Sequence, residues 1–189
     1  GFSRNIGVEK AKGEIIIFID SDMTFDKDYL KNLTKPIIEN YSVIGTTHDY
    51  EIVENVRNIW SKCWGRIRVS PKDAKEVKIF RAIRRKEFIK MGGFDPKYGY
   101  ADDQTFWFKF KIKPVVANNT ICYHKNPETL KAVYKQSRWI GASIDNSVLR
   151  IPVLSYLIPL IMIVLFPLLI PFLTIKKVIK QNEYLIIAY

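Results

Sequence analysis

Residues 15–19 form an uninterrupted apolar run that ends at Asp20, Ser21 and Asp22. Consecutive β-branched and aromatic residues are typical of a strand buried on both faces of a largely parallel sheet. Ligands of open α/β sheets bind just beyond the carboxyl ends of the strands. Because Asp20 and Asp22 are two residues apart, extended backbone would project both carboxylates from one face, where two oxygen donors suit a divalent cation.

Strand and helix periods alternate along the first 126 residues. Further strands are predicted over residues 41–47, 78–83, 115–116 and 120–124. Helices are predicted over residues 3–12, 26–36, 51–69, 84–91 and 100–109. Strands that alternate with helices indicate an α/β layer architecture.

The pattern changes after residue 126. Residues 127–150 predict an amphipathic helix, whose basic stripe of Lys131, Lys135 and Arg138 would suit a membrane interface. Residues 151–175 contain no charge, which exceeds the length of about 18 residues typical of a membrane segment. Four interior prolines leave a kinked span and a re-entrant segment both open. We therefore divide the chain into a catalytic layer (1–126), an interfacial helix (127–150), and a membrane segment with the start of another apolar segment (151–189).

The composition favours a partner rich in phosphate. The 189 residues carry a formal net charge of +11, which suits a nucleotide or an anionic membrane surface. Two distant cysteines without metal-ligand spacing indicate free thiols in a reducing compartment. Arg81, Arg84 and Arg85 are expected on a basic surface. Because the chain opens without Met and stops inside an apolar run, we interpret both ends as cuts through a longer protein.

Several short motifs together resemble family 2 glycosyltransferases of GT-A fold. The motifs occur in the order of that family between Ser3 and His124: Ser3-Arg4-Asn5-Ile6-Gly7, Ala11-Lys12-Gly13-Glu14, Asp20-Ser21-Asp22, Gly92-Gly93-Phe94-Asp95 and Asp102-Asp103. The resemblance implies a Rossmann-like, mostly parallel sheet with helices on both faces. It implies a partial GT-A fold that this chain enters at its middle, without the N-terminal strands that hold the nucleotide base.

The resemblance also implies a donor side of the site. Asp20 would contact the donor ribose or the metal, and Asp22 would bind the metal that bridges the diphosphate. His124 would complete the ligands of this Mg²⁺ or Mn²⁺ ion, and Arg4 would face the diphosphate. A cation and a nearby arginine are what a leaving diphosphate requires, because its charge must be neutralised.

An acceptor side is implied in the same way. Asp103 would be the general base on the acceptor hydroxyl, beside Asp102, which stands where the family has Glu. Gly92 and Gly93 would let the backbone approach the donor sugar. Independently of the family, glycosyl transfer needs a carboxylate that takes the proton of the acceptor.

The expected function is metal-dependent, inverting transfer of a hexose from a nucleotide-sugar donor to a lipid-phosphate or glycan acceptor. We expect the protein at a membrane, with its catalytic domain on the cytoplasmic side and no nucleic-acid partner. Two alternatives remain open. Asp20-Ser21-Asp22-Met23-Thr24 also fits a haloacid-dehalogenase-like phosphatase with Asp20 as nucleophile, and the charge fits a non-catalytic, basic, membrane-anchored binding module.

Overall fold

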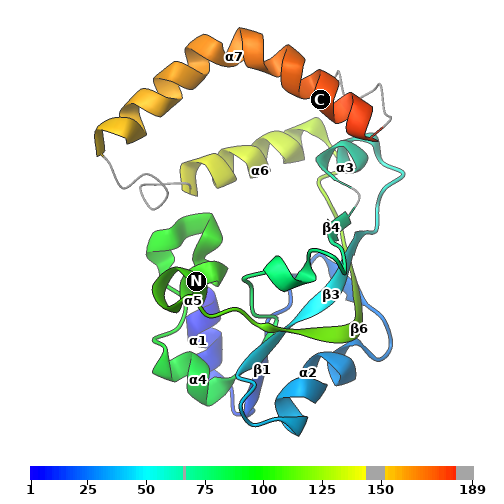
Figure 1. Cartoon of the computed structure of the whole chain (residues 1–189), viewed down its shortest axis with the longest axis vertical. Helices are drawn as coiled ribbons and strands as arrows, with labels where there is room; N and C mark the ends of the chain where they lie inside the picture. The colour runs from blue at the N-terminus through cyan, green and yellow to red at the C-terminus, as the bar shows by residue number, and fades with distance from the viewer. Residues whose placement is uncertain (66, 144–151, 182–189) are drawn as a thin grey trace. The chain divides into compact units, whose positions relative to one another are not determined.

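The computed structural model describes residues 1–65, 67–143 and 152–181 (Figure 1). The chain divides into two compact units, Gly1–Ser143 and Ile144–Tyr189. The strands are β1 (Ile15–Ile17), β2 (Met23–Phe25), β3 (Gly45–Val53), β4 (Ile67–Val69), β5 (Ala82–Arg84) and β6 (Val115–His124). The α-helices of the first unit are α1 (Phe2–Lys10), α2 (Tyr29–Glu39), α3 (Ile59–Trp64), α4 (Arg85–Lys90), α5 (Thr105–Phe110) and α6 (Leu130–Ser143). Two 3₁₀ helices are η1 (Ala74–Glu76) and η2 (Pro96–Gln104).

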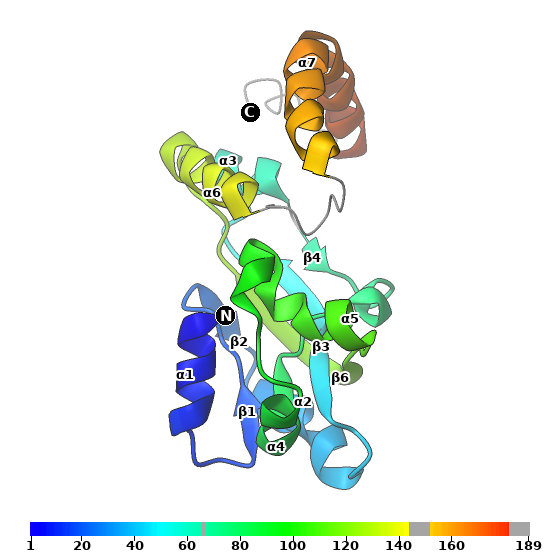
Figure 2. The same cartoon turned by 90° about the vertical axis from the view of Figure 1, so that its left-hand side faces the viewer.

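The sheet is mixed, so the prediction of a mostly parallel sheet is wrong. Its strands follow the order β1-β5-β3-β6-β2, and β4 pairs with β3 outside this path. Among the described strands, β3 and β6 form the parallel pair and lie side by side in both views (Figures 1 and 2). The other pairings are antiparallel. The error has a physical reason: a strand buried on both faces has the same apolar pattern in either direction.

Helices cover both faces of this sheet, as the sequence predicts. On β1, Ile16 packs in a core with α1, α4 and α5, whereas Ile15 and Ile17 pack against the core formed with α2. Neighbouring residues of β5 divide in the same way, with Ile83 in the first core and Ala82 in the second. Residues 15–17 are therefore a strand packed between two layers of helices, with Ile16 buried and Ile15 and Ile17 partly buried.

The predicted helix over residues 51–69 is wrong. β3 continues to Val53, a short helix α3 follows, and β4 returns to pair with β3. Asn58 begins α3, because its side chain accepts hydrogen bonds from the backbone N–H groups of Trp60 and Ser61. Trp60 and Trp64 are four residues apart, as on one face of a helix, but the helix that contains them spans only Ile59–Trp64.

The two strand pieces predicted at residues 115–116 and 120–124 join into one long strand, β6. Its register against β3 shifts between His48 and Tyr50, where Asn119 has a positive φ of 56°. The Asp49 carboxylate accepts hydrogen bonds from the backbone N–H groups of Asn119 and Thr120, at 2.9 and 3.0 Å. The Asp49 side chain thus supplies hydrogen-bond acceptors for β6 at the point where its regular pairing with β3 is interrupted.

The helix predicted over residues 127–150 is α6 for residues 130–143, and its last part lies outside the described residues. Val133 is buried, while Lys131, Lys135 and Arg138 are exposed. In the second unit, α7 (Pro152–Gln181) is a curved helix that continues through its interior prolines (Figure 1). Within the described residues, no helix combines the length and apolar character needed to cross a membrane.

Candidate active site

Strand pairing brings Asp22 and His124 together. Asp22 directly precedes β2, and His124 is the last residue of β6, where it pairs with Met23. The Asp22 carboxylate lies 3.0 Å from Nε2 of His124 (Oδ2 to Nε2). The backbone N–H of Lys125 also donates to the Asp22 carbonyl at 3.0 Å. Two of the three predicted metal ligands are therefore adjacent, although they are about a hundred residues apart in sequence.

Asp20 is held by two arginines. Arg81 donates from Nη1 to Oδ2 at 2.9 Å, and Arg4 donates from Nη2 to Oδ1 at 3.3 Å. Burial alone would raise the pKa of the Asp20 carboxyl, but the charge and hydrogen bond of Arg81, together with Arg4, hold it below its usual value. Asp20 is thus an ionised, paired carboxylate whose oxygens already have partners.

Arg4 connects the two carboxylate motifs. Its Nη1 lies 3.1 Å from Oδ1 of Asp102, while its Nη2 contacts Asp20. Arg4 lies on α1, and about a third of its side chain is exposed. One guanidinium therefore spans the donor-side and acceptor-side carboxylates that the sequence predicts.

Asp103 differs from its neighbour. Burial, opposed by Arg4 and reinforced by Asp102, raises the pKa of Asp103 to about 6. In the described part of the chain, no hydrogen bond or ion pair to its carboxylate is found. Neither carboxylate caps helix α5. The N-cap residue of α5 is Gln104, and no side chain accepts a capping hydrogen bond there. Helix capping of α5 therefore does not explain the presence of this pair.

Gly92 and Gly93 end helix α4. Both have a left-handed backbone, with φ of 80° and 69°, which glycine adopts without strain. A Cβ on Gly93 would lie 2.9 Å from Oδ1 of Asn5. Asn5 in turn exchanges two hydrogen bonds with the backbone of Phe94. The described contacts give the pair a role in the turn, and its predicted approach to the donor sugar stays a prediction.

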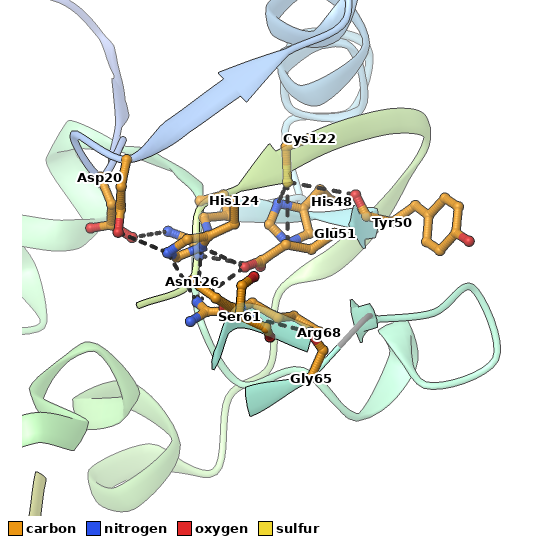
Figure 3. Close-up of polar contacts among 12 residues, drawn as sticks. Asp20, His48, Tyr50, Glu51, Ser61, Gly65, Arg68, Cys122, His124 and Asn126 are labelled. Atoms are coloured by element: carbon orange, nitrogen blue, oxygen red, sulfur yellow. Dashed lines mark hydrogen bonds and ion pairs between the residues drawn. The ribbon is translucent and has the colours of Figure 1, made fainter. Parts of the chain in front are cut away.

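Glu51 is the site residue that sequence reasoning missed. Its side chain is 5% exposed and lies between two imidazoles (Figure 3). Oε1 is 2.8 Å from Nδ1 of His124, and Oε2 is 3.0 Å from Nε2 of His48. Burial alone would raise the pKa of Glu51, but these histidines and Arg81 hold it well below its usual range. The sequence of β3 does not alternate between apolar and polar residues, and the wrong helix assignment over residues 51–69 placed Glu51 outside the sheet.

The expected basic surface at Arg81, Arg84 and Arg85 is also wrong. Arg81 is 11% exposed and lies between Asp20 and Glu51, 3.6 Å from Oε2 of the latter. Arg84 donates to the Val43 carbonyl, and Arg85 donates to the Val8 carbonyl. Each guanidinium donates a hydrogen bond to a carboxylate or a carbonyl group. These arginines therefore stabilise the fold and do not form a solvated basic surface.

A second group of potential ligands lies deeper in the sheet. His48, Glu51 and Cys122 are buried, and their ligand atoms lie within 4.8 Å of one another. They already contact each other and Tyr29, whose hydroxyl is 3.1 Å from Nδ1 of His48. Among the described residues, Asp20, Asp22 and His124 do not form so compact a group. We interpret the buried group as a hydrogen-bond network, because its members already contact one another and Tyr29; burial also raises the pKa of the Cys122 thiol to about 12.

A curled, mixed sheet between layers of helices, with carboxylates gathered at the ends of its strands, is consistent with a partial GT-A fold. The sequence profile described as "Glycosyl transferase family 2" matches residues 1–112, which is more than half of the chain. The chain therefore belongs to glycosyl transferase family 2. This assignment leaves the phosphatase alternative without support.

Other comparisons are more distant. No curated protein matches the chain. Among solved structures, it resembles one described as "Crystal structure of GalNAc-T7 with UDP, GalNAc and Mn2+", with a TM-score of 0.45 and 18% identity over 72% of this chain. The match covers 34% of that protein, so the chain spans about a third of its length.

Proposed function

We propose that the protein transfers a hexose from a nucleotide-sugar donor to a lipid-linked or glycan acceptor. Membership of glycosyl transferase family 2 supports the use of a nucleotide sugar. The observation that carries the proposal is the position of Arg4, which contacts Asp20 with one nitrogen and Asp102 with the other. The two carboxylate pairs consequently border one space, as a donor and an acceptor that react with each other require.

The residues on the donor side fit a divalent cation. Asp22 Oδ2 and His124 Nε2 are 3.0 Å apart, and an oxygen with an imidazole nitrogen suits Mn²⁺, while Mg²⁺ favours oxygen. A cation bound by these two residues would neutralise charge on the diphosphate leaving group. Asp20 is already paired with Arg81 and Arg4, so we assign it to the orientation of Arg4 and to the donor ribose instead of a primary ligand role.

On the acceptor side, Asp103 is the base that we propose. With a pKa raised to about 6, it is deprotonated at neutral pH and more basic than an ordinary aspartate. Such a carboxylate can accept the acceptor's proton while the acceptor oxygen attacks the sugar. A single base on one side of the sugar, with the diphosphate leaving from the other side, corresponds to direct displacement with inversion.

We further propose attachment to a membrane, with the catalytic unit on the cytoplasmic side. Helix α7 exposes many large apolar side chains, among them Leu160, Val164, Phe166 and Phe172. Exposed apolar surface of this extent is typical of contact with a partner or with lipid. Helix α6 adds the exposed cations Lys131, Lys135 and Arg138. Carbonate washing of membranes tests the proposal: retention in the pellet supports integral attachment, and complete release contradicts it.

The decisive experiment is a donor screen on the full-length protein, with release of nucleoside diphosphate as the readout. Each nucleotide sugar is tested with Mn²⁺, with Mg²⁺ and with EDTA. We expect one donor to be used in a cation-dependent way, and Asp103→Asn to abolish that activity. Asp73→Asn is the matched control, because this carboxylate lies outside the site and bonds to Ser70. Absence of release from every donor would overturn the proposal.

A further inference from the structure

Glu51 lies between the only two histidines of the chain. One carboxylate oxygen is 2.8 Å from Nδ1 of His124, and the other is 3.0 Å from Nε2 of His48 (Figure 3). Both histidines are nearly inaccessible, at 6% and 1% exposure. Each imidazole therefore has a carboxylate oxygen of its own, in a region that water does not reach freely.

Strand register produces this arrangement. His124 on β6 pairs with Val53 on β3, so Glu51, two residues earlier on β3, faces the same side of the sheet. His48 and Glu51 are three residues apart and would face opposite sides of a regular strand. β3 is not regular here, because its register against β6 shifts between His48 and Tyr50, and Nε2 of His48 lies 3.0 Å from Oε2 of Glu51. The backbone pairing of β3 with β6 thus determines that the side chains of Glu51 and His124 lie on the same side of the sheet.

The contact with Glu51 decides which nitrogen of His124 carries hydrogen. An ionised carboxylate only accepts hydrogen bonds, so the 2.8 Å contact requires a proton on Nδ1 of His124. Nε2 then faces Asp22 Oδ2 at 3.0 Å. The Nδ1 proton is needed whether Nε2 carries a second proton toward Asp22 or a cation. Histidine ligands of metals usually donate their other N–H to a carboxylate or carbonyl in this manner.

Two arginines compensate the negative charge of the buried Glu51 carboxylate. Arg81 Nη2 and Arg68 Nη1 lie 3.6 and 3.5 Å from the oxygens of Glu51. Arg68 Nη1 is also 2.8 and 3.1 Å from the two ring nitrogens of His124. A single atom cannot lie on the lone-pair axes of both nitrogens, because these axes diverge. Because Nδ1 donates to the ionised Glu51 carboxylate, it has no lone pair for Arg68, and we assign Arg68 to charge compensation of Glu51.

We propose that Glu51 is a positioning residue that holds His124 as its Nδ1–H tautomer, with Nε2 directed at the cation site shared with Asp22. This inference rests on the proposed function and deepens it. It assigns Glu51 no contact with substrate and no part in proton transfer to the acceptor. It predicts that Glu51 controls cation affinity even when no donor is present.

The first test observes the tautomer directly. Nitrogen-15 histidine NMR of the full-length protein with Mg²⁺, which is diamagnetic, separates the two imidazoles, and His48→Gln identifies the signals of His124. We expect His124 to carry hydrogen on Nδ1 in the wild-type protein. A wild-type spectrum with the proton on Nε2 alone overturns the proposal. This result requires no substitution at Glu51, so it holds even if every Glu51 variant fails to fold.

The second test measures Mn²⁺ affinity by electron paramagnetic resonance, without donor. We expect Glu51→Gln to raise the dissociation constant by about 10–100-fold, the usual cost of removing the partner of a metal-ligating histidine. His48→Gln is the matched control, because it alters the other oxygen of the same carboxylate, and we expect a change of less than about threefold. Glu51→Asp keeps the charge and should recover part of the affinity.

The outcomes separate this inference from the proposed function. If Glu51→Gln folds and binds Mn²⁺ like the wild type while Asp22→Asn does not, Glu51 has no positioning role. If no donor is used in the screen above, the proposed transfer is wrong, but the tautomer and the Mn²⁺ affinities still decide the role of Glu51.

Discussion

The two pairs of aspartates have the same chemistry in sequence and different surroundings in the structure. In each pair, one member is held by arginine: Asp20 by Arg81 and Arg4, and Asp102 by Arg4. The other member is not. Asp22 faces His124 and is half exposed, and Asp103 has no ion pair within the described residues.

The comparison indicates that the two carboxylates of each pair have different roles. A carboxylate paired with a buried guanidinium keeps its charge but has few free lone pairs for a ligand. A neighbour without an arginine partner keeps more of its lone pairs available for a cation or a proton. Substitution to asparagine should therefore act on structure at Asp20 and Asp102, and on chemistry at Asp22 and Asp103.

The largest expected effect is at Asp103. Asp103→Asn keeps the shape of the side chain but cannot accept the acceptor's proton, so we expect turnover to fall by about 10²–10⁴-fold. Donor and cation binding, measured by calorimetry on the full-length protein, should stay near wild-type values. Asp102→Asn is the control and should be much less damaging. The opposite order would assign the base to Asp102.

The two aspartates on the donor side, Asp20 and Asp22, should respond differently to substitution by asparagine. We expect Asp22→Asn to reduce Mn²⁺ affinity by about 10-fold or more, because one of two ligands loses its charge. Asp20→Asn should instead lower the free energy of unfolding, by on the order of 1 kcal/mol, because the ion pair with Arg81 is lost from a partly exposed position. Calorimetric titration and denaturant unfolding on both variants give the four values. Equal effects of the two variants would remove the distinction within this pair.

A smaller effect should appear in the pH dependence of turnover. The raised pKa of Asp103, about 6, means that the carboxyl is protonated and inactive as a base below this pH. Turnover at saturating donor and cation should therefore fall about tenfold for each pH unit below about 6. A profile that stays flat down to pH 5 would show that Asp103 does not supply the base.

The smallest effect concerns the turn that precedes the acceptor pair. Gly93→Ala combines a left-handed φ with a Cβ 2.9 Å from Asn5, and we expect a loss of about 1–3 kcal/mol in the free energy of unfolding. Gly92→Ala has a similar φ but no atom within 4 Å of the added Cβ. Its loss should be near the lower limit, about 1 kcal/mol. Equal losses would show that Asn5 yields without cost.

The sequence could indicate much of the candidate site, because its residues lie where strands and turns end. Asp20 and Asp22 follow an apolar run, and His124 closes another strand. These positions are visible from hydrophobic pattern alone. Strand direction is not visible, because apolar residues pack equally well in parallel and antiparallel strands.

Glu51 and Arg81 could not be found by this reasoning. Each is a buried charged residue, and its partner comes from a distant part of the chain. Sequence pattern assigns such residues to the surface, because an unpaired charge is costly to bury. Only the pairing of β3 with β6, and of β1 with β5, shows that the charges compensate one another.

The order of the strands has a consequence for the synthesis of this protein. Among the strands of the described residues, β6 comes last along the chain, yet it lies between β3 and β2 in the sheet. While the ribosome is still making residues 54–114, β2 and β3 have no partner between them, and their hydrogen-bonding edges remain open. Long-range pairing of this kind is slow and exposes the chain to aggregation. The strand that carries His124 thus also covers the open edges of β2 and β3, so this part of the sheet stays exposed to wrong pairing until β6 is made.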